Sequence, residues 1–482
     1  MSKEQSENGF ETISVPIHYS TSELIKKENP GKKAPQYIAG LTASLAALSM
    51  GNTLAWTSQI SEELLEGQLG FPVTVDELGW VGSFMPLGAA TLSLFIGPLA
   101  DLFGRKLSML LLIIPATLGW CLLIWPQNLA MLYSGRFITG MVAGAFCVLS
   151  LIYSSEIAQK EIRGALGSYT QMMISSGILF ANVMAKFLSI KGFTIACAGI
   201  PIVFGAIFIF MPESPIFLMK KDKVQQARTA LLRLRGEDYY VEEEIKEIET
   251  SLKEYQMHSG MAIVKESLKK SSSQKACIIG LALMIFKSAN GMDAITAYTS
   301  YIFENVKMGL DAKYGTIILN VFQVGSAVVQ SLVVDKLGRR LLLWLSAAIM
   351  TVCLILVGLT LTLKEENIVA EEYHIYIDYI PLIALVVFTI AFSLGLGPIP
   401  WLMMGEIFPP EFKSLAASVA TFVSWIAAFA VTKMFLVVED NLGGDIVFYI
   451  FAVITTIAVV FTLALVPETK NKTFNEIQQS LN

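Results

Sequence analysis

Twelve windows of mostly apolar residues run through the sequence, each close to the ~20 residues that a helix needs to span a bilayer. They lie near residues 37–58, 78–100, 107–126, 130–155, 165–187, 193–211, 276–303, 314–334, 341–363, 379–404, 414–437 and 445–466. The chain is 54% hydrophobic and only 16% charged, which excludes a soluble globular protein of 482 residues. The sequence therefore predicts an all-α membrane protein with twelve transmembrane helices.

A charged motif appears twice with identical spacing. The stretch Asp-Leu-Phe-Gly-Arg-Lys at 101–106 returns 234 residues later as Asp-Lys-Leu-Gly-Arg-Arg at 335–340. Two further acid-base motifs repeat in the same order: Glu156 with Arg163 matches Glu406 with Lys413, and Pro-Glu-Ser at 212–214 matches Pro-Glu-Thr at 467–469. Such repetition predicts two related, pseudo-symmetric bundles of six helices each.

The expected domains follow from this duplication. They are a cytosolic N-terminal tail (1–36), an N-terminal six-helix bundle (37–211), a cytosolic helical linker (212–275), a C-terminal six-helix bundle (276–466) and a cytosolic C-terminal tail (467–482). The linker is rich in Lys, Glu and Arg, and Leu231, Leu234, Ile245 and Ile248 have the spacing of amphipathic surface helices. The glycine-rich loops and histidine cluster of a soluble enzyme domain are absent from this linker sequence.

Loop charges predict which side of the membrane each end faces. An even number of spans places both termini on one side. The first predicted outer loop, 59–77, holds five acidic residues and no Lys or Arg, whereas the predicted inner loops hold Arg105, Lys106, Arg339 and Arg340. Because inner loops of membrane proteins carry the excess of basic residues, we expect both termini in the cytosol.

The seventh span carries unusual polar residues. Lys287, Ser288, Asn290 and Asp293 lie in an otherwise apolar window. A charge at membrane depth costs several kcal/mol unless it is paired or meets water, so we expect this segment to face an aqueous cavity, with the helix unwound at Gly291. The alternative is a mutually neutralising pair of Lys287 and Asp293, although residues six apart do not share the face of a straight helix.

Three other spans contribute candidate binding residues. Gln171 in the fifth span and Gln323 in the eighth offer amides that suit a polyhydroxylated solute, although helix-helix hydrogen bonds explain each amide equally well. The stretch 395–401 in the tenth span, Gly-Leu-Gly-Pro-Ile-Pro-Trp, must kink or break the helix because proline lacks an N–H. We expect this break to line a cavity beside Trp401; a purely structural kink is the alternative.

Charged residues gather in the predicted inner loops and at the adjoining helix ends. Solvated loop charges are the ordinary interpretation, but their repetition in both halves favours interhelical ion pairs that close the cytosolic side in one state and separate in another. This predicted gate comprises Asp101, Arg105, Glu156, Arg163, Glu213, Asp335, Arg339, Arg340, Glu406, Lys413 and Glu468.

These motifs together resemble one known family. The chain resembles the sugar porters of the major facilitator superfamily, the facilitative glucose transporters, and within them the insect trehalose-transporter-like branch, over residues 37–475. The motifs are 101–106, Gly-Arg-Phe at 135–137, Ser-Glu-Ile at 155–157 with Arg-Gly at 163–164, Pro-Glu-Ser-Pro at 212–215, Leu-Arg-Gly at 234–236, 335–340, Gly-Pro-Ile-Pro-Trp at 397–401 with Glu406, and Pro-Glu-Thr-Lys at 467–470. The stretch 51–58 resembles the trehalose branch in particular.

The resemblance implies alternating access, with substrate bound between the halves near mid-membrane, and a plasma-membrane location. It also assigns Gln171, Trp401 and Trp425 to the substrate site, and Gln323 stands where many members have asparagine. The seventh span departs from the family pattern. Three amides that contact sugar in family members are replaced in this chain, two of them by charged residues. Ser393 also stands where glucose carriers often have glutamate, and Ile216 replaces a usual arginine.

The predicted function is a facilitative sugar carrier, for a hexose or for trehalose, in a lipid bilayer. The first span has no acid between Tyr37 and Ser58, where proton-coupled relatives resemble one another in having an aspartate, so we expect uniport. A proton-coupled symporter using Asp293 is one alternative, and a sugar receptor that does not transport is another. The three histidines are scattered, and the five cysteines lie inside apolar runs, so neither set has a catalytic or metal-binding pattern. We therefore expect no enzyme activity, cofactor, metal or nucleic-acid partner. The oligomeric state is open.

Overall fold

The computed structural model describes residues 31–258, 266–305, 311–365, 374–409, 411–470, 472 and 474–481. Residues 1–30 of the expected N-terminal tail and 259–265 of the expected linker lie outside this part. The described chain is helical, without strands, as the sequence predicts. Its first half comprises α2 (Ala34–Leu65), α3 (Val75–Ser93), α4 (Ile96–Phe103), α5 (Arg105–Leu111), α6 (Ile113–Ile124), α7 (Leu129–Ile157), α8 (Arg163–Phe187) and α9 (Ile190–Phe208).

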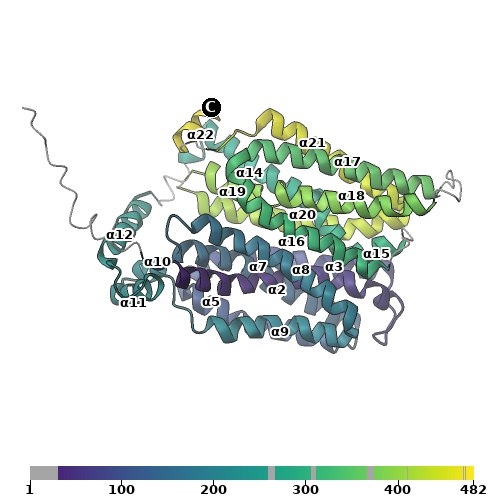
Figure 1. The fold of residues 1–482 in the computed structure, drawn as a ribbon, viewed down its shortest axis with the longest axis horizontal. Coiled ribbons are helices and arrows are strands. Elements are labelled where there is room, and N and C mark those ends of the chain that lie inside the picture. The colour runs from purple at the N-terminus through teal and green to yellow at the C-terminus, as the bar shows by residue number, and fades with distance from the viewer. Residues whose placement is uncertain are drawn as a thin grey trace, which may run out of the picture.

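The second half begins after three linker helices, α10 (Pro215–Lys220), α11 (Val224–Arg235) and α12 (Val241–His258). It comprises α14 (Ser271–Ala289), α15 (Met292–Asn305), α16 (Ala312–Leu337), α17 (Arg339–Glu365), α18 (His374–Leu394), α19 (Ile399–Ile407), α20 (Lys413–Leu442) and α21 (Gly444–Leu465), followed by a short terminal helix, α22 (Phe474–Ser480). Figure 1 shows helices α2 to α9 packed as one bundle against the bundle of α14 to α21.

The two bundles repeat one packing scheme. In the first, α2 packs on α8, α3 on α7 and α6 on α9. In the second, the equivalent contacts join α14 and α15 to α20, α16 to α18 and α17 to α21. The internal repeat of the sequence is therefore also a repeat of helix packing. Across the interface between the bundles, α2 contacts α15, α3 contacts α20, and α8 contacts α16.

Helices occupy all twelve predicted spans, although several spans are divided. Helices α3 and α4 meet at a bend of 50°. Among the described residues, nine helical stretches are long and apolar enough to cross a membrane, or ten when this bent pair counts as one span. The two remaining helices, α8 and α16, contain Gln171, Asn182, Asn320 and Gln323 and pack against each other at the bundle interface. Their polar residues make them less apolar than helices that face lipid.

The linker helices pack together at one end of the molecule (Figure 1). Leu231 and Ile245 are buried with Phe217, as their spacing predicts, whereas Leu234 packs onto the first bundle. The Arg235 side chain is only 1% exposed, pairs with Glu244 at 2.7 Å and donates to the Ile157 carbonyl at 2.8 Å. The linker is thereby attached to the end of α7. We call this end of the molecule the linker end and the opposite end the far end.

A glycine turn with a carboxylate cap stands at the linker end of each bundle. Gly104 has φ +99°, and the Glu213 carboxylate accepts the backbone N–H groups of Arg105 and Lys106 at the start of α5. The second half repeats this arrangement: Gly338 has φ +89°, and Glu468 accepts from Arg339 and Arg340 at the start of α17. Each carboxylate satisfies N–H groups that have no partner within their own helix.

The second cap also accounts for the lowered pKa of its carboxylate. Burial raises the pKa of Glu468, but backbone N–H donors, those of Lys470, Arg339, Arg340 and Thr469, outweigh burial and lower it overall. The ionised carboxylate is therefore the form that this turn stabilises.

Gly338→Ala tests this turn. A Cβ on Gly338 would lie 2.7 Å from Glu468 Oε2 on a backbone of positive φ, so we expect a loss of about 2 kcal/mol in the free energy of unfolding. The control is Gly325→Ala in α16, where a Cβ meets no atom within 4 Å and is expected to leave stability unchanged or slightly higher. Unfolding in SDS-detergent mixtures measures both, and equal stabilities for the two variants would contradict the cap.

Candidate transport site

The seventh predicted span breaks between α14 and α15. Asn290 donates from Nδ2 to the carbonyls of Phe286 and Lys287, and its Oδ1 accepts the Met292 N–H at 2.8 Å. Gly291 follows with φ +93°, and a Cβ there would lie 2.4 Å from the Phe451 ring. The helix therefore unwinds at Gly291, as the sequence predicts, and Asn290 holds the break rather than presenting a free amide.

This break allows Lys287 and Asp293 to meet. Lys287 Nζ lies 3.3 Å from Asp293 Oδ2, and the two side chains are 12% and 15% exposed. The Lys287 ammonium also lies 5.7 Å from the centre of the Trp425 ring. Six residues apart on a straight helix, the two groups would point to different faces; the unwound turn brings them together. The neutralising pair considered from the sequence is thus formed.

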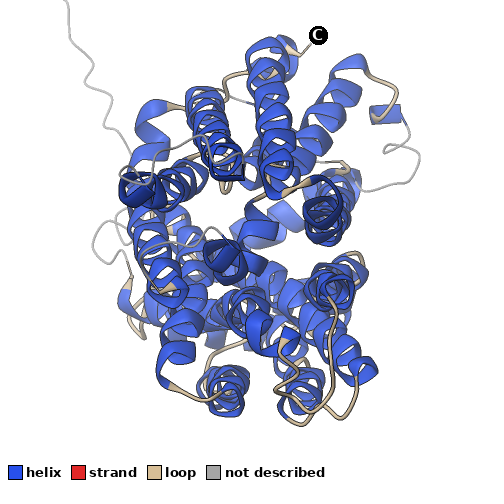
Figure 2. Cartoon of the chain, turned by 90° about the vertical axis from the view of Figure 1, so that its right-hand side faces the viewer, coloured by secondary structure: helices blue, strands red, loops and turns tan. Residues whose placement is uncertain are grey.

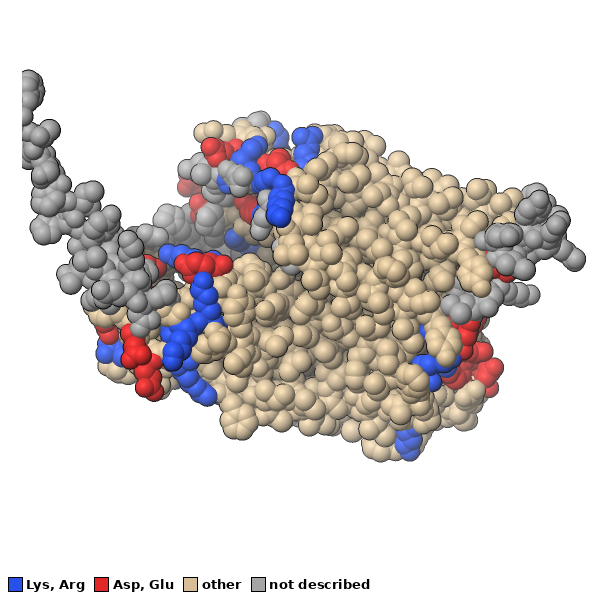
Figure 3. Space-filling view, in the orientation of Figure 1, with Lys and Arg blue, Asp and Glu red and all other residues tan. Residues whose placement is uncertain are grey.

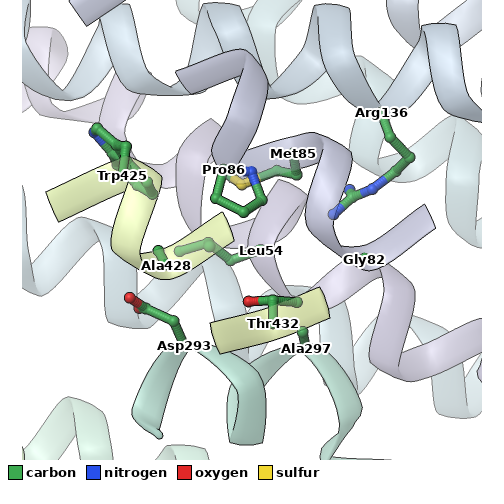
Figure 4. A pocket seen from close by; sticks show the side chains of 10 residues that line it. All are labelled: Leu54, Gly82, Met85, Pro86, Arg136, Asp293, Ala297, Trp425, Ala428 and Thr432. Atoms are coloured by element: carbon green, nitrogen blue, oxygen red, sulfur yellow. The ribbon is translucent and has the colours of Figure 1, made fainter. Parts of the chain in front are cut away.

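Asp293 borders a recess between the two bundles. Figure 4 shows Asp293, Trp425 and Thr432 of the second half across from Met85 and Arg136 of the first. The recess holds about 10 Å³, room for about one water molecule. A sugar can occupy this position only after the bundles move apart.

Arg136 is a residue of this recess that the sequence analysis did not assign to the site. It is 1% exposed, donates to the carbonyls of Thr53 at 2.7 Å and Val81 at 3.2 Å, and lies over the Trp56 ring at 5.4 Å. Backbone carbonyls and an aromatic face therefore surround this buried cation. An arginine inside an apolar window was the signal that could have placed it in the site.

The other predicted binding residues are distributed more widely. Ser288 is fully buried and shares a 2.8 Å hydrogen bond with Ser424. Gln323 is 3% exposed, and its Oε1 has no hydrogen-bond partner among the described residues. Ser393 is 4% exposed and Gln171 is half-buried. These four residues do not border the recess beside Asp293.

The tenth predicted span breaks where its glycines and prolines lie. Helix α18 ends at Leu394 and α19 begins at Ile399. In between, the Leu396 N–H donates to Ser346 Oγ at 2.9 Å, so one side of the break packs against α17. Trp401 follows in α19 and is half-buried. The break is confirmed, and at Leu396 it packs against protein instead of bordering the recess beside Asp293.

At the linker end, the predicted gate charges form clusters within each half. In the first, Arg105 pairs with Asp101 at 2.9 Å and with Glu156 at 2.7 Å, and the Arg105 and Glu156 side chains are 8% and 12% exposed. Ser214 Oγ completes the cluster by donating to Glu156 at 2.5 Å. Glu213 caps α5, as described above. Arg163 is exposed.

The second half repeats this cluster. Arg339 pairs with Glu406 at 3.1 Å, and Thr469 Oγ1 donates to Glu406 at 2.5 Å. Lys413 is exposed and donates to the Gly405 carbonyl. Arg340 and Glu468 belong to the cap, and the Asp335 side chain lies outside the described part of the structure. The ion pairs of Arg105 and Arg339 join helices of one bundle, and the role of these residues as a gate stays a prediction.

Three ion pairs between the bundles lie at the far end, at residues that the sequence analysis did not select. They form between neighbouring ends of α2, α3 and α8 in the first half and residues of α16 and α20 in the second. They are Asp76 with Lys433 at 2.5 Å, Glu63 with Lys313 at 3.0 Å, and Lys186 with Asp311 at 2.5 Å.

Hydrogen bonds reinforce this contact. Ser58 Oγ accepts the Ser300 N–H at 3.0 Å, and Gln59 Nε2 donates to Ser300 Oγ at 3.2 Å. The hydrogen bond from Lys186 lowers the pKa of Asp311, so the carboxylate of that pair is ionised at neutral pH. The structure is therefore a state in which the far end is closed.

The family of the chain follows from comparison with known proteins. The family model "Sugar (and other) transporter" matches residues 34–481. The chain belongs to this sugar transporter family. The facilitated trehalose transporter Tret1 of Bombyx mori is 33% identical over 446 residues, covering 92% of this chain and 86% of that protein. Tret1 of Apis mellifera ligustica is 32% identical over 454 residues, covering 94% and 89%.

Solved structures confirm the major facilitator fold of this sugar transporter family member. The proton:xylose symporter XylE bound to 6-bromo-6-deoxy-D-glucose is 22% identical, with a TM-score of 0.75 over 93% of this chain and 99% of that chain. An inward open conformation of XylE from E. coli gives a TM-score of 0.76 at 23% identity, covering 92% and 99%. The family resemblance seen in the sequence motifs is confirmed, and its members are transporters rather than enzymes.

A double-mutant cycle tests the pair at the centre of the site. Lys287→Met and Asp293→Asn each leave one buried charge without its partner, so we expect each to lower the free energy of unfolding by about 3 kcal/mol. The double variant removes both charges and is expected to recover most of that loss. SDS-induced unfolding measures all three. A double variant that loses the sum of the two single effects would contradict the pairing.

Proposed function

We propose that this protein carries a neutral sugar, trehalose or a hexose, across the membrane by alternating access, as a facilitative uniporter. The observation that carries the proposal is the Lys287–Asp293 pair at the unwound turn of α14 and α15, beside Trp425 and at the interface of the two bundles. Together the two groups have no net charge, yet they offer strong donors and acceptors to hydroxyl groups. Trp425 offers an apolar face for the C–H side of a sugar ring.

The relatives support a sugar as the substrate. The Bombyx mori and Apis mellifera ligustica proteins are named facilitated trehalose transporters, and they are aligned with almost all of this chain. We extend their substrate class to this protein, with hexoses as the second candidate. The predicted residues Gln171, Gln323, Ser393 and Trp401 are proposed to meet the sugar in a state where the bundles have moved.

Alternating access is supported by a contrast between the two ends. Pairs within a bundle are buried, as with Arg105 and Glu156. Two of the three pairs between bundles have solvated carboxylates, because the Asp76 side chain is 66% exposed and that of Asp311 is 48% exposed. The third pair, Glu63 with Lys313, is 15% and 26% exposed. Exposed pairs contribute at most about 1 kcal/mol each. Each bundle is therefore expected to move as a rigid body, while the far-end contact opens and closes.

The predicted gate residues at the linker end suit the opposite state of the cycle, in which the linker end is closed and the far end is open. Arg163 and Lys413 are exposed cations at the linker ends of the two bundles. We propose that they reach the acidic clusters around Glu156 and Glu406 of the opposite bundle when the linker end closes and the far end opens.

Uniport is supported by the partner of Asp293. A proton-coupled cycle needs a carboxylate that gains and loses a proton. Protonating Asp293 would leave the Lys287 ammonium buried without its counter-charge, which is unfavourable. Helix α2, where the related symporters resemble one another in having an aspartate, has no acidic residue before Glu62 near its far end.

The expected topology and location complete the proposal. We propose that the linker end faces the cytosol, because the basic gate residues lie there, and that the far end with its acidic loop faces outward. On this proposal the two tails and the linker 212–275 are cytosolic, the bundles 37–211 and 276–466 cross the plasma membrane, and transport requires no cofactor or metal.

Uptake into proteoliposomes tests the substrate and the coupling. We expect saturable uptake of labelled trehalose or glucose whose rate is unchanged when the external pH is shifted to either side of neutrality. Accumulation driven by an imposed pH gradient, lost in Asp293→Asn, would replace uniport by proton coupling.

Absence of flux for both sugars would bear on whether the protein is a transporter or a receptor. If correctly folded protein shows sugar-dependent thermal stabilisation without flux, the receptor alternative replaces the transporter proposal. The matched control for Asp293→Asn in these uptake and stabilisation measurements is Gly325→Ala, because a Cβ at Gly325 meets no atom within 4 Å.

A further inference from the structure

A second cavity lies at the far end, separate from the recess beside Asp293. It holds about 270 Å³ and is bordered by the ends of α2, α8, α9 and α16. Its rim is exposed at Gln68 and Leu188, so it is reached from the far side even while the bundles are in contact there. The two cavities share no lining residue.

One wall carries a buried acceptor without a partner. Gln59 is 3% exposed and donates through Nε2 to Ser300 Oγ, while its Oε1 has no hydrogen-bond partner among the described residues. An unsatisfied buried acceptor is unfavourable, and this oxygen has almost no exposed surface in the structure, so a donating ligand in the cavity reaches it once the Gln59 side chain rotates. Ser189 at the rim accepts the Gly192 N–H at 3.3 Å and retains its own hydroxyl proton for donation.

The remaining lining selects the chemical class of that ligand. Glu63 and Lys313 pair with each other at 3.0 Å, so this wall is polar but already neutralised and does not demand an ion. Ile60 and Phe193 form an apolar wall, each 1% exposed. Hydroxyl donors on one side and C–H groups on the other are the features of a sugar ring. The volume lies just below the ~300 Å³ at which pockets for drug-sized ligands begin, which favours a monosaccharide over a disaccharide.

We propose that this far-end cavity is a binding site for a neutral monosaccharide, selective for the state in which the far end is closed. Gln59, Glu63 and Ser189 come from the first bundle, whereas Lys313 and Ser300, the partner of Gln59, come from the second. Opening the far end separates these groups and removes the site. A ligand bound here therefore stabilises the closed far end and opposes its reopening.

Cysteine labelling tests the site directly. Gln68→Cys places a thiol at the rim, and a membrane-impermeant maleimide reports its access in the full-length protein in proteoliposomes. With D-glucose as the probe at about ten times its dissociation constant, we expect labelling to slow about tenfold. The control Asn441→Cys, exposed at the end of α20 and outside the cavity lining, is expected to label at an unchanged rate.

Second substitutions in the Gln68→Cys protein identify the groups responsible. Gln59→Leu removes the buried acceptor, and Ser189→Ala removes the rim hydroxyl. Because Ser189 also caps α9 through the Gly192 N–H, the second change is expected to cost about 1 kcal/mol of stability. Both variants are expected to lose the protection. Gly325→Ala is expected to keep it, because a Cβ there meets no atom within 4 Å and the residue lies outside the cavity lining. Protection absent from the parent, retained in both cavity variants, or lost in Gly325→Ala would overturn the proposal.

A kinetic consequence rests on the transport function proposed above. High external glucose is expected to slow uptake in the wild type and not in Gln59→Leu, since a ligand at the far end delays the return of the empty carrier. Labelling requires no flux, so a protein that fails to transport but shows specific protection separates failure of the transport proposal from failure of this site.

Discussion

A charge buried away from water must meet an opposite charge or a set of hydrogen-bond donors and acceptors, and this requirement organises the whole molecule. At the linker end, Glu213 and Glu468 accept backbone N–H groups at the start of α5 and α17. Between the two bundles, Lys287 is paired with Asp293, and Arg136 is held by backbone carbonyls and the Trp56 ring. Each of these sites fixes the geometry of the helices that surround it.

The distribution of these pairs gives the molecule its mechanical character. Buried clusters within each bundle resist separation of its own helices, whereas two of the three ion pairs between bundles at the far end have carboxylates that are 66% and 48% exposed. Buried ion pairs within the two bodies and partly solvated ion pairs between them favour movement of the bodies without local unfolding. The central pair lies where the two bodies meet, so their movement changes its access to water.

The sequence was sufficient for the fold because its strongest signals are local. Apolar windows predicted the helices, the spacing of motifs predicted the duplication, and Gly291 predicted the unwound turn. The site was harder, because it depends on contacts across the chain. The meeting of Lys287 with Asp293 requires the turn that Asn290 holds, and no residue spacing on a straight helix indicates it. The pair of Asp76 with Lys433 joins residues 357 apart in the chain, and neither belongs to a repeated motif.

Cross-linking of the far end tests alternating access most directly. Asp76→Cys and Lys433→Cys, combined in one protein, replace the ion pair that joins α3 to α20. A short reducible cross-linker between them is expected to hold the far end closed, abolish sugar uptake, and release it again on reduction, with each single-cysteine variant unaffected. Undiminished uptake by the fully cross-linked protein would show that the far end does not have to open, and would contradict the account.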